Sequence, residues 1–258
     1  MLVLLPPSEG KAAGAGDGAP VRLEALSLPG LTAARETVLA ELTDLCAGDP
    51  DKAREVLGLG VRLAGEVTRN AALRTAPPAP AGAVYTGVLY DALGLGTLDP
   101  AARRRAEASL LIFSGLWGAL RVTDRVPAYR CSAGVRLPAL GGLAAYWRRP
   151  LAAVLPAEAA ADGGPLLDLR SAAYRALWKP TGELAERTVT VRVLHGPSRT
   201  VVSHFNKATK GRLVRDLLTA GELPATLPGL TGALRDLGYT VERPDGDDRQ
   251  LDIVVDQV

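Results

Sequence analysis

Short apolar runs alternate with stretches of helical periodicity along this chain, and that alternation limits its fold more narrowly than any other feature. Leu2–Leu5 and Leu110–Phe113 are continuous apolar runs, typical of strands that are buried on both faces. Asp99-Pro100 indicates a helix start, with an aspartate cap followed by proline at the first helical position. With 258 residues and 47% hydrophobic content, we predict one α/β domain spanning residues 1–258, with a mixed central sheet flanked by helices.

Other segments extend this pattern toward both ends of the chain. The stretch 51–70 favours two helices joined by the turn Gly58-Leu59-Gly60. A strand is expected to end at Val84-Tyr85. Two hairpins are also expected from period-2 runs joined by turn residues: Thr188–Leu194 with Thr200–Phe205, and Tyr239–Glu242 with Leu251–Val255.

Composition excludes several classes of site. The formal net charge is only +2, so nucleic-acid binding would need a local basic patch. Cys46 and Cys131 form no CxxC pair, which is typical of a reducing cytoplasm, and with His195 and His204 they are too few for a zinc site. We expect no metal and no cofactor. Pro6-Pro7 interrupts the first apolar run, and no later run approaches the roughly 20 residues of a membrane span, so we expect a cytoplasmic protein with no membrane partner.

Lysine is rare in this chain, which has five lysines among its 30 basic Lys and Arg residues. Lys207 and Lys210, with Arg212, follow Val201-Val202 at the start of an expected late helix. The helix dipole disfavours cations at that position, so a bound anion such as phosphate would relieve the conflict. The same cluster is equally typical of a solvated basic face.

Four strands are expected to end in polar loops that contain glycine, at residues 8–11, 85–87, 114–118 and 168–171. Because ligand crevices form at the carboxyl ends of strands in α/β sheets, we expect these loops to converge on one site. Asp124 and Ser171 are equally typical of turn and helix caps. The sequence contains no P-loop, no GxSxG and no GxGxxG after a strand. The candidate catalytic residues are Lys11, Arg130 and Asp168, and the candidate pocket residues are Ser8, Tyr85, Thr86, Ser114, Asp124, Tyr129, Ser171 and Tyr174.

Several motifs together resemble the peroxide stress protein YaaA family. The upstream motif is Tyr85-Thr86-Gly87, and the central run is Phe113-Ser114-Gly115-Leu116-Trp117-Gly118-Ala119-Leu120-Arg121, followed by Asp124, Pro127, Tyr129-Arg130 and Gly134. Further along, Leu169, Ser171 and Tyr174 match the family's L-x-S-x-x-Y, and Lys207 and Gly211 fall on its late basic helix. The similarity spans nearly the whole chain. It departs at Pro7-Ser8-Glu9-Gly10-Lys11, where better-known members have a shorter Ser-Pro-Ala-Lys loop, and at Asp168, where they have asparagine.

The resemblance implies a cytoplasmic protein that limits oxidative damage under peroxide stress by keeping free intracellular iron low. It also implies a single α/β fold with a helix-hairpin-helix element and a positively charged cleft that binds DNA. In the 51–70 stretch, backbone amides with Arg62 and Arg69 would hold phosphates without reading bases. A plain αα-hairpin would use the same glycines only to turn the chain. Neither cysteine has an activating neighbour in sequence, which disfavours a peroxide-reactive thiol.

Two functions from different classes follow from these observations. The first is a stress-response protein that binds DNA independently of base sequence, through Arg62, Arg69, Arg121, Lys207, Lys210 and Arg212. The second is an enzyme acting on a phosphorylated or nucleotide-like small molecule, held by Arg130 and Lys207, with Asp168 orienting one of them or acting as a base. A basic groove open at both ends would favour the duplex, and a closed pocket with Asp168 and Tyr129 would favour the small ligand.

Overall fold

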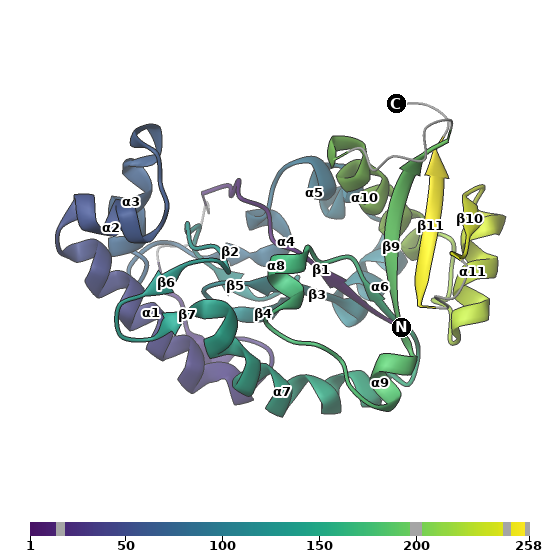
Figure 1. Cartoon of the computed structure of the whole chain (residues 1–258), viewed down its shortest axis with the longest axis horizontal. Coiled ribbons are helices and arrows are strands. Elements are labelled where there is room, and N and C mark those ends of the chain that lie inside the picture. Colours follow the sequence, from purple (N-terminus) through teal and green to yellow (C-terminus); the bar gives the residue numbers. More distant parts are fainter. Residues whose placement is uncertain (14–18, 197–202, 245–248, 256–258) are drawn as a thin grey trace.

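A mixed seven-stranded sheet forms the centre of the computed structural model, which describes residues 1–13, 19–196, 203–244 and 249–255 (Figure 1). The strand order is β10-β11-β9-β8-β1-β3-β4. The strands of this sheet are β1 (Leu2–Leu5), β3 (Leu110–Ser114), β4 (Gly118–Arg121), β8 (Leu166–Asp168), β9 (Thr188–His195), β10 (Thr240–Glu242) and β11 (Gln250–Val255). Two smaller two-stranded sheets pair β2 (Ala79–Pro80) with β5 (Arg125–Val126) and β6 (Arg136–Leu137) with β7 (Gly141–Gly142).

Parallel pairing dominates the middle of the main sheet. β1 pairs in parallel with β3 and β8, β9 pairs in parallel with β8 and β11, and the outer pairs β3–β4 and β10–β11 are antiparallel. Every residue of β1 and β3 is buried, because strands at the centre of a parallel sheet are covered on both faces. The predicted α/β fold with a mixed central sheet is therefore confirmed.

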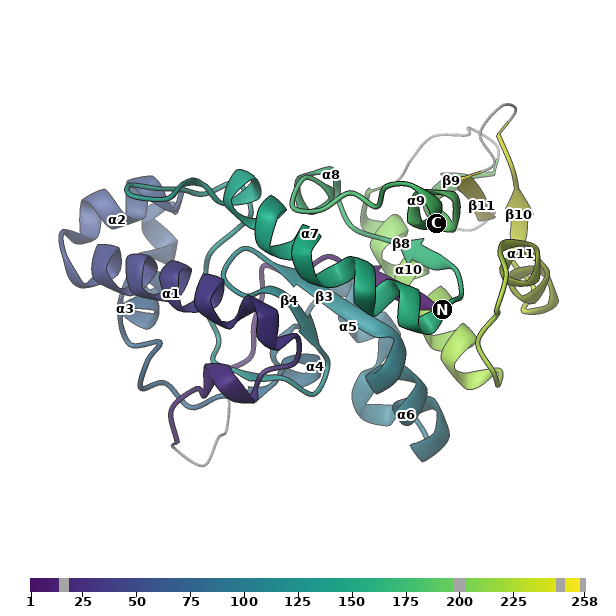
Figure 2. The ribbon, with the colours of Figure 1, turned by 90° about the horizontal axis from the view of Figure 1, so that it is seen from below.

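Helices lie on both sides of this sheet (Figure 2). Figure 1 shows α7 below the central strands and α5 with α10 above them, while α1 to α3 lie at the opposite end of the molecule from β9 to β11. One continuous cluster of buried side chains joins these elements, so the described residues form a single domain. The helices are α1 (Thr32–Ala47), α2 (Pro50–Val56), α3 (Gly65–Ala71), α4 (Ala81–Val84), α5 (Val88–Leu93), α6 (Pro100–Ser109), α7 (Leu143–Asp162), α8 (Ala172–Arg175), α9 (Glu183–Glu186), α10 (Ser203–Thr219) and α11 (Leu227–Asp236).

Several element boundaries agree with the expected signals. The Asp99 carboxylate accepts hydrogen bonds from the backbone N–H groups of Ala101 at 2.7 Å and Ala102 at 2.9 Å, so α6 begins as predicted. The two helices expected in the 51–70 stretch are α2 and α3, and Gly58 turns the chain between them with a φ of +64°. The final hairpin is present as β10 and β11.

Two expected strands are wrong. Ala81–Val84 is helix α4, so Tyr85 follows a helix and joins Lys11 only through an isolated bridge. The segment expected to pair with β9 instead enters α10 at Ser203, and residues 200–202 lie outside the described part. The physical reason is that both edges of β9 are taken, one by β8 and the other by β11, which leaves no room for a hairpin partner.

Candidate functional site

The turn between β3 and β4 carries the run Ser114 to Gly118, and packing explains its composition. The Ser114 hydroxyl oxygen accepts hydrogen bonds from the N–H groups of Leu116 at 3.1 Å and Trp117 at 2.9 Å. A Cβ at Gly115 would lie 2.6 Å from the carbonyl oxygen of Cys131. Gly118 has a φ of +73°, and a Cβ there would lie 2.7 Å from the Trp147 ring. Each glycine therefore allows a close approach that any side chain would prevent.

A chain of three hydroxyl groups starts from this turn. The Tyr129 hydroxyl lies 2.6 Å from Ser114 Oγ and 2.9 Å from the Tyr85 hydroxyl. Since Ser114 Oγ already accepts two N–H groups, its own proton is donated to Tyr129, which in turn donates to Tyr85. Burial raises the pKa of Tyr85 to about 12 and the pKa of Tyr129 well above its usual value, so both phenols stay protonated at neutral pH.

Lys11 extends over these two tyrosine rings. Its Nζ lies 4.4 Å from the ring centre of Tyr129 and 5.5 Å from that of Tyr85, and it donates a hydrogen bond to the Ser8 carbonyl oxygen at 2.8 Å. Burial lowers the pKa of the Lys11 amine to about 8, because its charged form is less well solvated there; the Glu9 carboxylate opposes the shift and the Arg130 guanidinium adds to it.

Arg130 also lies near Lys11 and contacts Glu9. Its Nε lies 3.1 Å from the Glu9 carboxylate, and its Nη1 donates to the Glu9 carbonyl oxygen at 3.1 Å. Asn70 of α3 fixes the Arg130 backbone with two hydrogen bonds, of 2.8 and 2.9 Å. The partner of Arg130 is therefore Glu9, and neither Asp124 nor Asp168 pairs with it.

Asp168 pairs with Arg170, and not, as we had expected, with a cation that would bind a ligand. Its two carboxylate oxygens accept from Arg170 Nε at 2.8 Å and Nη2 at 2.7 Å, and the pair is almost fully buried. The Arg170 guanidinium also stacks 4.2 Å over the Phe113 ring. Both carboxylate oxygens of Asp168 are therefore engaged by the Arg170 guanidinium. The Asp-x-Arg spacing directly after β8 was the sequence signal for Arg170, which we did not select as a site residue.

A basic cleft of about 600 Å³ lies beside this pair. It forms because β8 is three residues long and covers only Thr188–Thr190 of β9, whereas β9 continues to His195. Helix α10 covers the other side with Lys207 and Lys210. The residues that line the cleft are Pro6, Leu89, Leu169, Arg170, Ser171, Arg175, Thr190, Val191, Arg192, Asn206, Lys207, Lys210 and Gln250.

Three cations in this cleft have no carboxylate partner among the described residues: Arg175, Lys207 and Lys210. Arg192, by contrast, is paired with Asp252 at 2.5 Å. Burial lowers the pKa of Lys210 to about 8, and the Arg175 guanidinium contributes to this shift. An anion bound in the cleft would stabilise all three charges.

Asn206 adds a second kind of binding group to the cleft. Its Oδ1 is buried and has no hydrogen-bond partner in the described part of the chain. A buried acceptor without a partner costs free energy, so a ligand that donates a hydrogen bond would be favoured there. Neither Asn206 nor Arg175 was selected from the sequence, because neither belongs to a motif that marks a ligand.

The structure brings only some of the predicted site residues together. Ser8, Lys11, Tyr85, Thr86, Ser114, Tyr129 and Arg130 form one cluster, since the Thr86 N–H donates to Ser8 Oγ at 3.1 Å. Tyr174 joins its edge, accepting from the Ala133 N–H at 3.3 Å. Ser171, Lys207 and Lys210 line the cleft instead. Arg212 points to Thr209 on α10 at 3.4 Å.

Four other predicted residues lie elsewhere. Arg121 pairs with Leu111 at the far end of β3 from Ser114, and its guanidinium contacts Glu158. Asp124 caps a turn, accepting from the N–H groups of Ser27 at 2.7 Å and Arg121 at 2.9 Å. Arg62 and Arg69 belong to the 51–70 segment at the α2–α3 end of the molecule, opposite the strands that line the cleft (Figure 1).

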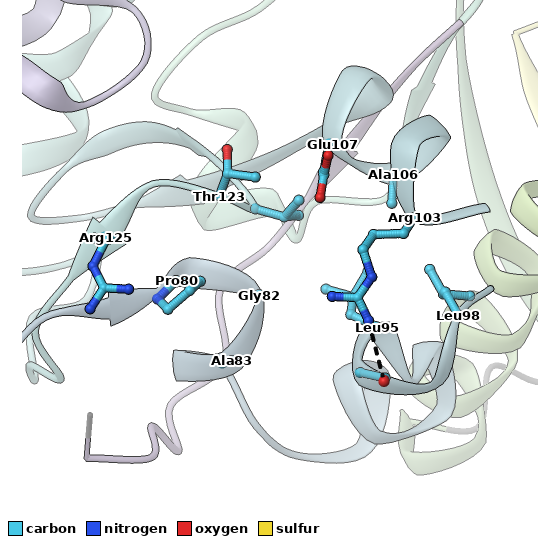
Figure 3. Close-up of a pocket in the computed structure, with 12 residues that line it drawn as sticks. Pro80, Gly82, Ala83, Leu95, Leu98, Arg103, Ala106, Glu107, Thr123 and Arg125 are labelled. Atoms are coloured by element: carbon cyan, nitrogen blue, oxygen red, sulfur yellow. Dashed lines mark hydrogen bonds between the residues drawn. The ribbon is translucent and has the colours of Figure 1, made fainter. Parts of the chain in front are cut away.

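A second cavity, of about 380 Å³, opens between α4, α6 and the chain after β4. Figure 3 shows Arg103 pointing along its side, where it donates to the Gly96 carbonyl oxygen at 3.4 Å. Leu95, Leu98 and Val122 make much of its wall apolar. None of the predicted site residues lines this cavity.

Some kinds of site are not found in the described part of the chain. It contains no helix both long and apolar enough to cross a membrane. The same residues hold no group of three or more His, Cys, Asp or Glu side chains placed to bind a metal ion.

The fold and this geometry define an α/β protein with a basic cleft next to a buried lysine–tyrosine cluster. The sequence profile described as peroxide stress protein YaaA matches residues 1–243. A UPF0246 protein of Streptomyces coelicolor is 65% identical over 262 aligned positions that cover 100% of both chains. Another, of Corynebacterium efficiens, is 42% identical over 255 positions, covering 99% of this chain and 100% of the relative. The chain belongs to the peroxide stress protein YaaA family.

Proposed function

We propose that this peroxide stress protein binds the phosphate backbone of DNA through the basic cleft, as a cytoplasmic protein that limits free intracellular iron and oxidative damage. The observation that carries the DNA-binding proposal is the group of three cations without carboxylate partners, Arg175, Lys207 and Lys210. Cations of this kind bind phosphates without reading bases.

The 51–70 segment supplies a second contact in this proposal. Arg62 is exposed and forms no ion pair with the described residues, whereas Arg69 is paired with Glu66 at 2.6 Å. Arg62 therefore contributes more than Arg69. In this proposal, binding along the DNA accounts for the protection against peroxide. The control of free iron is a further part of the same proposal.

The test is a salt titration of duplex binding, measured by fluorescence anisotropy on two duplexes of unrelated sequence. The fourfold variant Arg62→Ala/Arg69→Ala/Lys207→Ala/Lys210→Ala should lower the slope of log K against log salt by up to about four units, because each charge contributes at most about one. Arg149→Ala, at an exposed position of α7, removes one charge away from the cleft and is the control that should leave binding unchanged. Binding unchanged in the fourfold variant would exclude this footprint.

A second function has its own supporting observation, the buried Asn206 Oδ1 that lacks a donor. An enzyme that acts on a nucleotide-like molecule would place phosphate against Lys207 and Lys210 and a hydroxyl or amino group against Asn206. The volume of about 600 Å³ suits a ligand of that size. Thermal-shift titration with a nucleoside monophosphate, its nucleoside and inorganic phosphate tests this alternative. Stabilisation by the nucleotide that Asn206→Leu abolishes would support it.

A further inference from the structure

Lys11 and the tyrosines around it are reactive groups that phosphate binding in the cleft does not require. Its Nζ donates to the Ser8 carbonyl oxygen and lies over the rings of Tyr129 and Tyr85. The neighbouring carboxylate, Glu9, is paired with Arg130 at 3.1 Å. Within the described residues Lys11 forms no ion pair, so no carboxylate is fixed against this amine to hold its proton.

The hydroxyl chain beside Lys11 ends in the O–H group of Tyr85. Ser114 donates to Tyr129 and Tyr129 donates to Tyr85, so the Tyr85 O–H is left to donate onward. The nearest further hydroxyl oxygen, that of Ser114, already accepts two N–H groups. Tyr85 is 2% exposed, and its ring centre lies 5.5 Å from Lys11 Nζ. A substrate atom next to the amine would meet a phenol already polarised by two hydrogen bonds in series.

This cluster also adjoins the basic cleft. The Tyr90 hydroxyl donates to the Pro6 carbonyl oxygen at 2.6 Å, and Pro6 and Leu89 line the cleft. The Tyr90 ring stacks on Tyr85 with ring centres 5.5 Å apart. Tyr90 therefore contacts both Pro6, which lines the cleft, and Tyr85 of the lysine–tyrosine cluster.

We propose that Lys11 is a nucleophile that forms a Schiff base with an aldehyde, and that the aldehyde belongs to a sugar carrying a phosphate ester. The requirement for phosphate rests on the proposed function of the cleft, whereas the amine chemistry rests on Lys11 and Tyr85 alone. Two sources share this chemistry: the ring-opened sugar of an abasic site in DNA, and a free sugar phosphate.

The reaction uses only groups that are present. The Nζ lone pair forms a bond to the carbonyl carbon, and one amine proton moves to the former carbonyl oxygen, which gives a carbinolamine. The nitrogen lone pair then forms the C=N bond while the C–O bond breaks, and the oxygen leaves as water with the proton of Tyr85. The Tyr85 phenolate takes back a proton from the iminium nitrogen. The products are a neutral imine and water, with no oxidant or reductant consumed.

The protonation state of Lys11 agrees with this role. Burial lowers the pKa of its amine to about 8, so the neutral fraction near neutral pH is larger than that of an exposed lysine. Adduct formation should rise with pH through about 8. The charged and titratable groups that act on this amine come from several elements: Glu9, Arg130, Cys131 and Glu66.

The experiment is reductive trapping on the intact protein, with sodium cyanoborohydride as the hydride donor that converts an imine to a stable secondary amine. Three aldehydes are compared: duplex DNA with one abasic site, deoxyribose 5-phosphate, and deoxyribose without phosphate. Peptide mapping by mass spectrometry then assigns the adduct among the five lysines. Lys11→Arg keeps the charge but cannot condense and should lose the adduct. Lys179→Arg, on an exposed lysine, is the matched control and should retain it.

Each outcome decides the proposal. An adduct on Lys11 that exceeds labelling of the other lysines, and slows about 100-fold in Tyr85→Phe, supports it. Equal labelling of all five lysines, or an adduct confined to Lys210, overturns it. If the duplex binds but no aldehyde labels Lys11, the amine chemistry fails while the proposed function stands. If deoxyribose 5-phosphate labels Lys11 and the duplex neither binds nor reacts, the substrate is the free sugar phosphate and the DNA proposal fails.

Discussion

Two ion pairs near the site differ sharply in burial at the scale of single residues. In the Asp168–Arg170 pair, 3% and 0% of the side-chain surfaces are exposed, whereas Glu9, the partner of Arg130, is 59% exposed. Two buried charges stabilise each other only while both are present. An exposed pair is screened by water and contributes little. Mutation of the two pairs should therefore have different consequences.

Arg170→Met should lower the free energy of unfolding by about 3–5 kcal/mol, because it leaves the Asp168 carboxylate buried without a partner. Urea denaturation measures the loss. The double variant Asp168→Asn/Arg170→Met removes both charges and should recover most of it. A double variant as unstable as the single one would show that packing of Arg170 over Phe113, rather than its charge, is what matters.

Arg130→Ala should change the free energy of unfolding by less than about 1 kcal/mol, because its partner Glu9 is largely solvated. A thermal melt tests the stability, and survival of cells under peroxide tests the function. Loss of protection with an unchanged melt would assign Arg130 to the site. A large fall in melting temperature would instead show that its contacts with Glu9 and the backbone are structural.

The sequence predicted the hydroxyl-bearing residues of the cluster, but not every contact that positions the cluster. Ser114, Tyr85 and Tyr129 were selected for their hydroxyl groups beside glycine turns, and the structure places them in one hydrogen-bonded chain. Asn70, which holds the Arg130 backbone from 60 residues away, could not be found this way. A contact over that distance depends on how α3 packs, and local spacing contains no information about it.

At the scale of elements, the packing of helix α10 against α5 explains a glycine inside α10. It lies against α5, and a Cβ at Gly211 would overlap the carbonyl oxygen of Leu89 and lie 2.9 Å from Ala92 Cβ. The glycine is thus required by the neighbouring helix, although glycine weakens a helix in isolation. Gly232, inside α11, has nothing within 4 Å of the corresponding position.

These two glycines form a matched pair for mutation. Gly211→Ala should lower the melting temperature, because α10 must move away from α5 to admit the methyl group. Gly232→Ala should raise the free energy of unfolding by roughly 0.5–1 kcal/mol, because alanine is the better helix former and the site is open. Calorimetry of both variants measures the difference. Similar effects of the two would show that α5 and α10 separate at little cost.

Local sequence patterns predicted individual strands and helices, but not which strands lie side by side in the sheet. The apolar runs in β1 and β3 and the cap at Asp99 were read correctly, because burial on both faces and capping are local properties. The hairpin expected after β9 was wrong, because β11, about 60 residues later, takes that edge. Propensity alone does not specify which of two strands occupies an edge.

The pKa shifts of buried groups make stability depend on pH for the whole molecule. Burial lowers the pKa of Lys11 and of Lys210 to about 8, below the usual 10.5, so between these values the unfolded chain binds more protons and stability rises with pH. Burial also raises the pKa of Cys131 to about 12 from 9.0 and raises that of Cys46, so above pH 9 the unfolded thiols ionise first and stability falls.

The free energy of unfolding should therefore rise above pH 8 and stop rising near pH 9. The double variant Lys11→Met/Lys210→Met should be more stable than the parent at pH 7, because it buries no ammonium group. Its advantage should disappear by about pH 10.5, where the unfolded lysines lose their protons. Urea denaturation at pH 7, 8, 9 and 10 gives both profiles. Parallel profiles would show that neither lysine is buried as described.

The position of β1 has a consequence for synthesis of the chain on the ribosome. Leu2–Leu5 is synthesised before both of its neighbours in the sheet, β3 and β8, whose partner residues are Leu110–Ile112 and Leu166–Asp168. Its backbone N–H and C=O groups thus have no strand to pair with until more than a hundred further residues have emerged. During that interval the nascent chain exposes a segment that chaperones recognise and that neighbouring chains on a polysome can pair with.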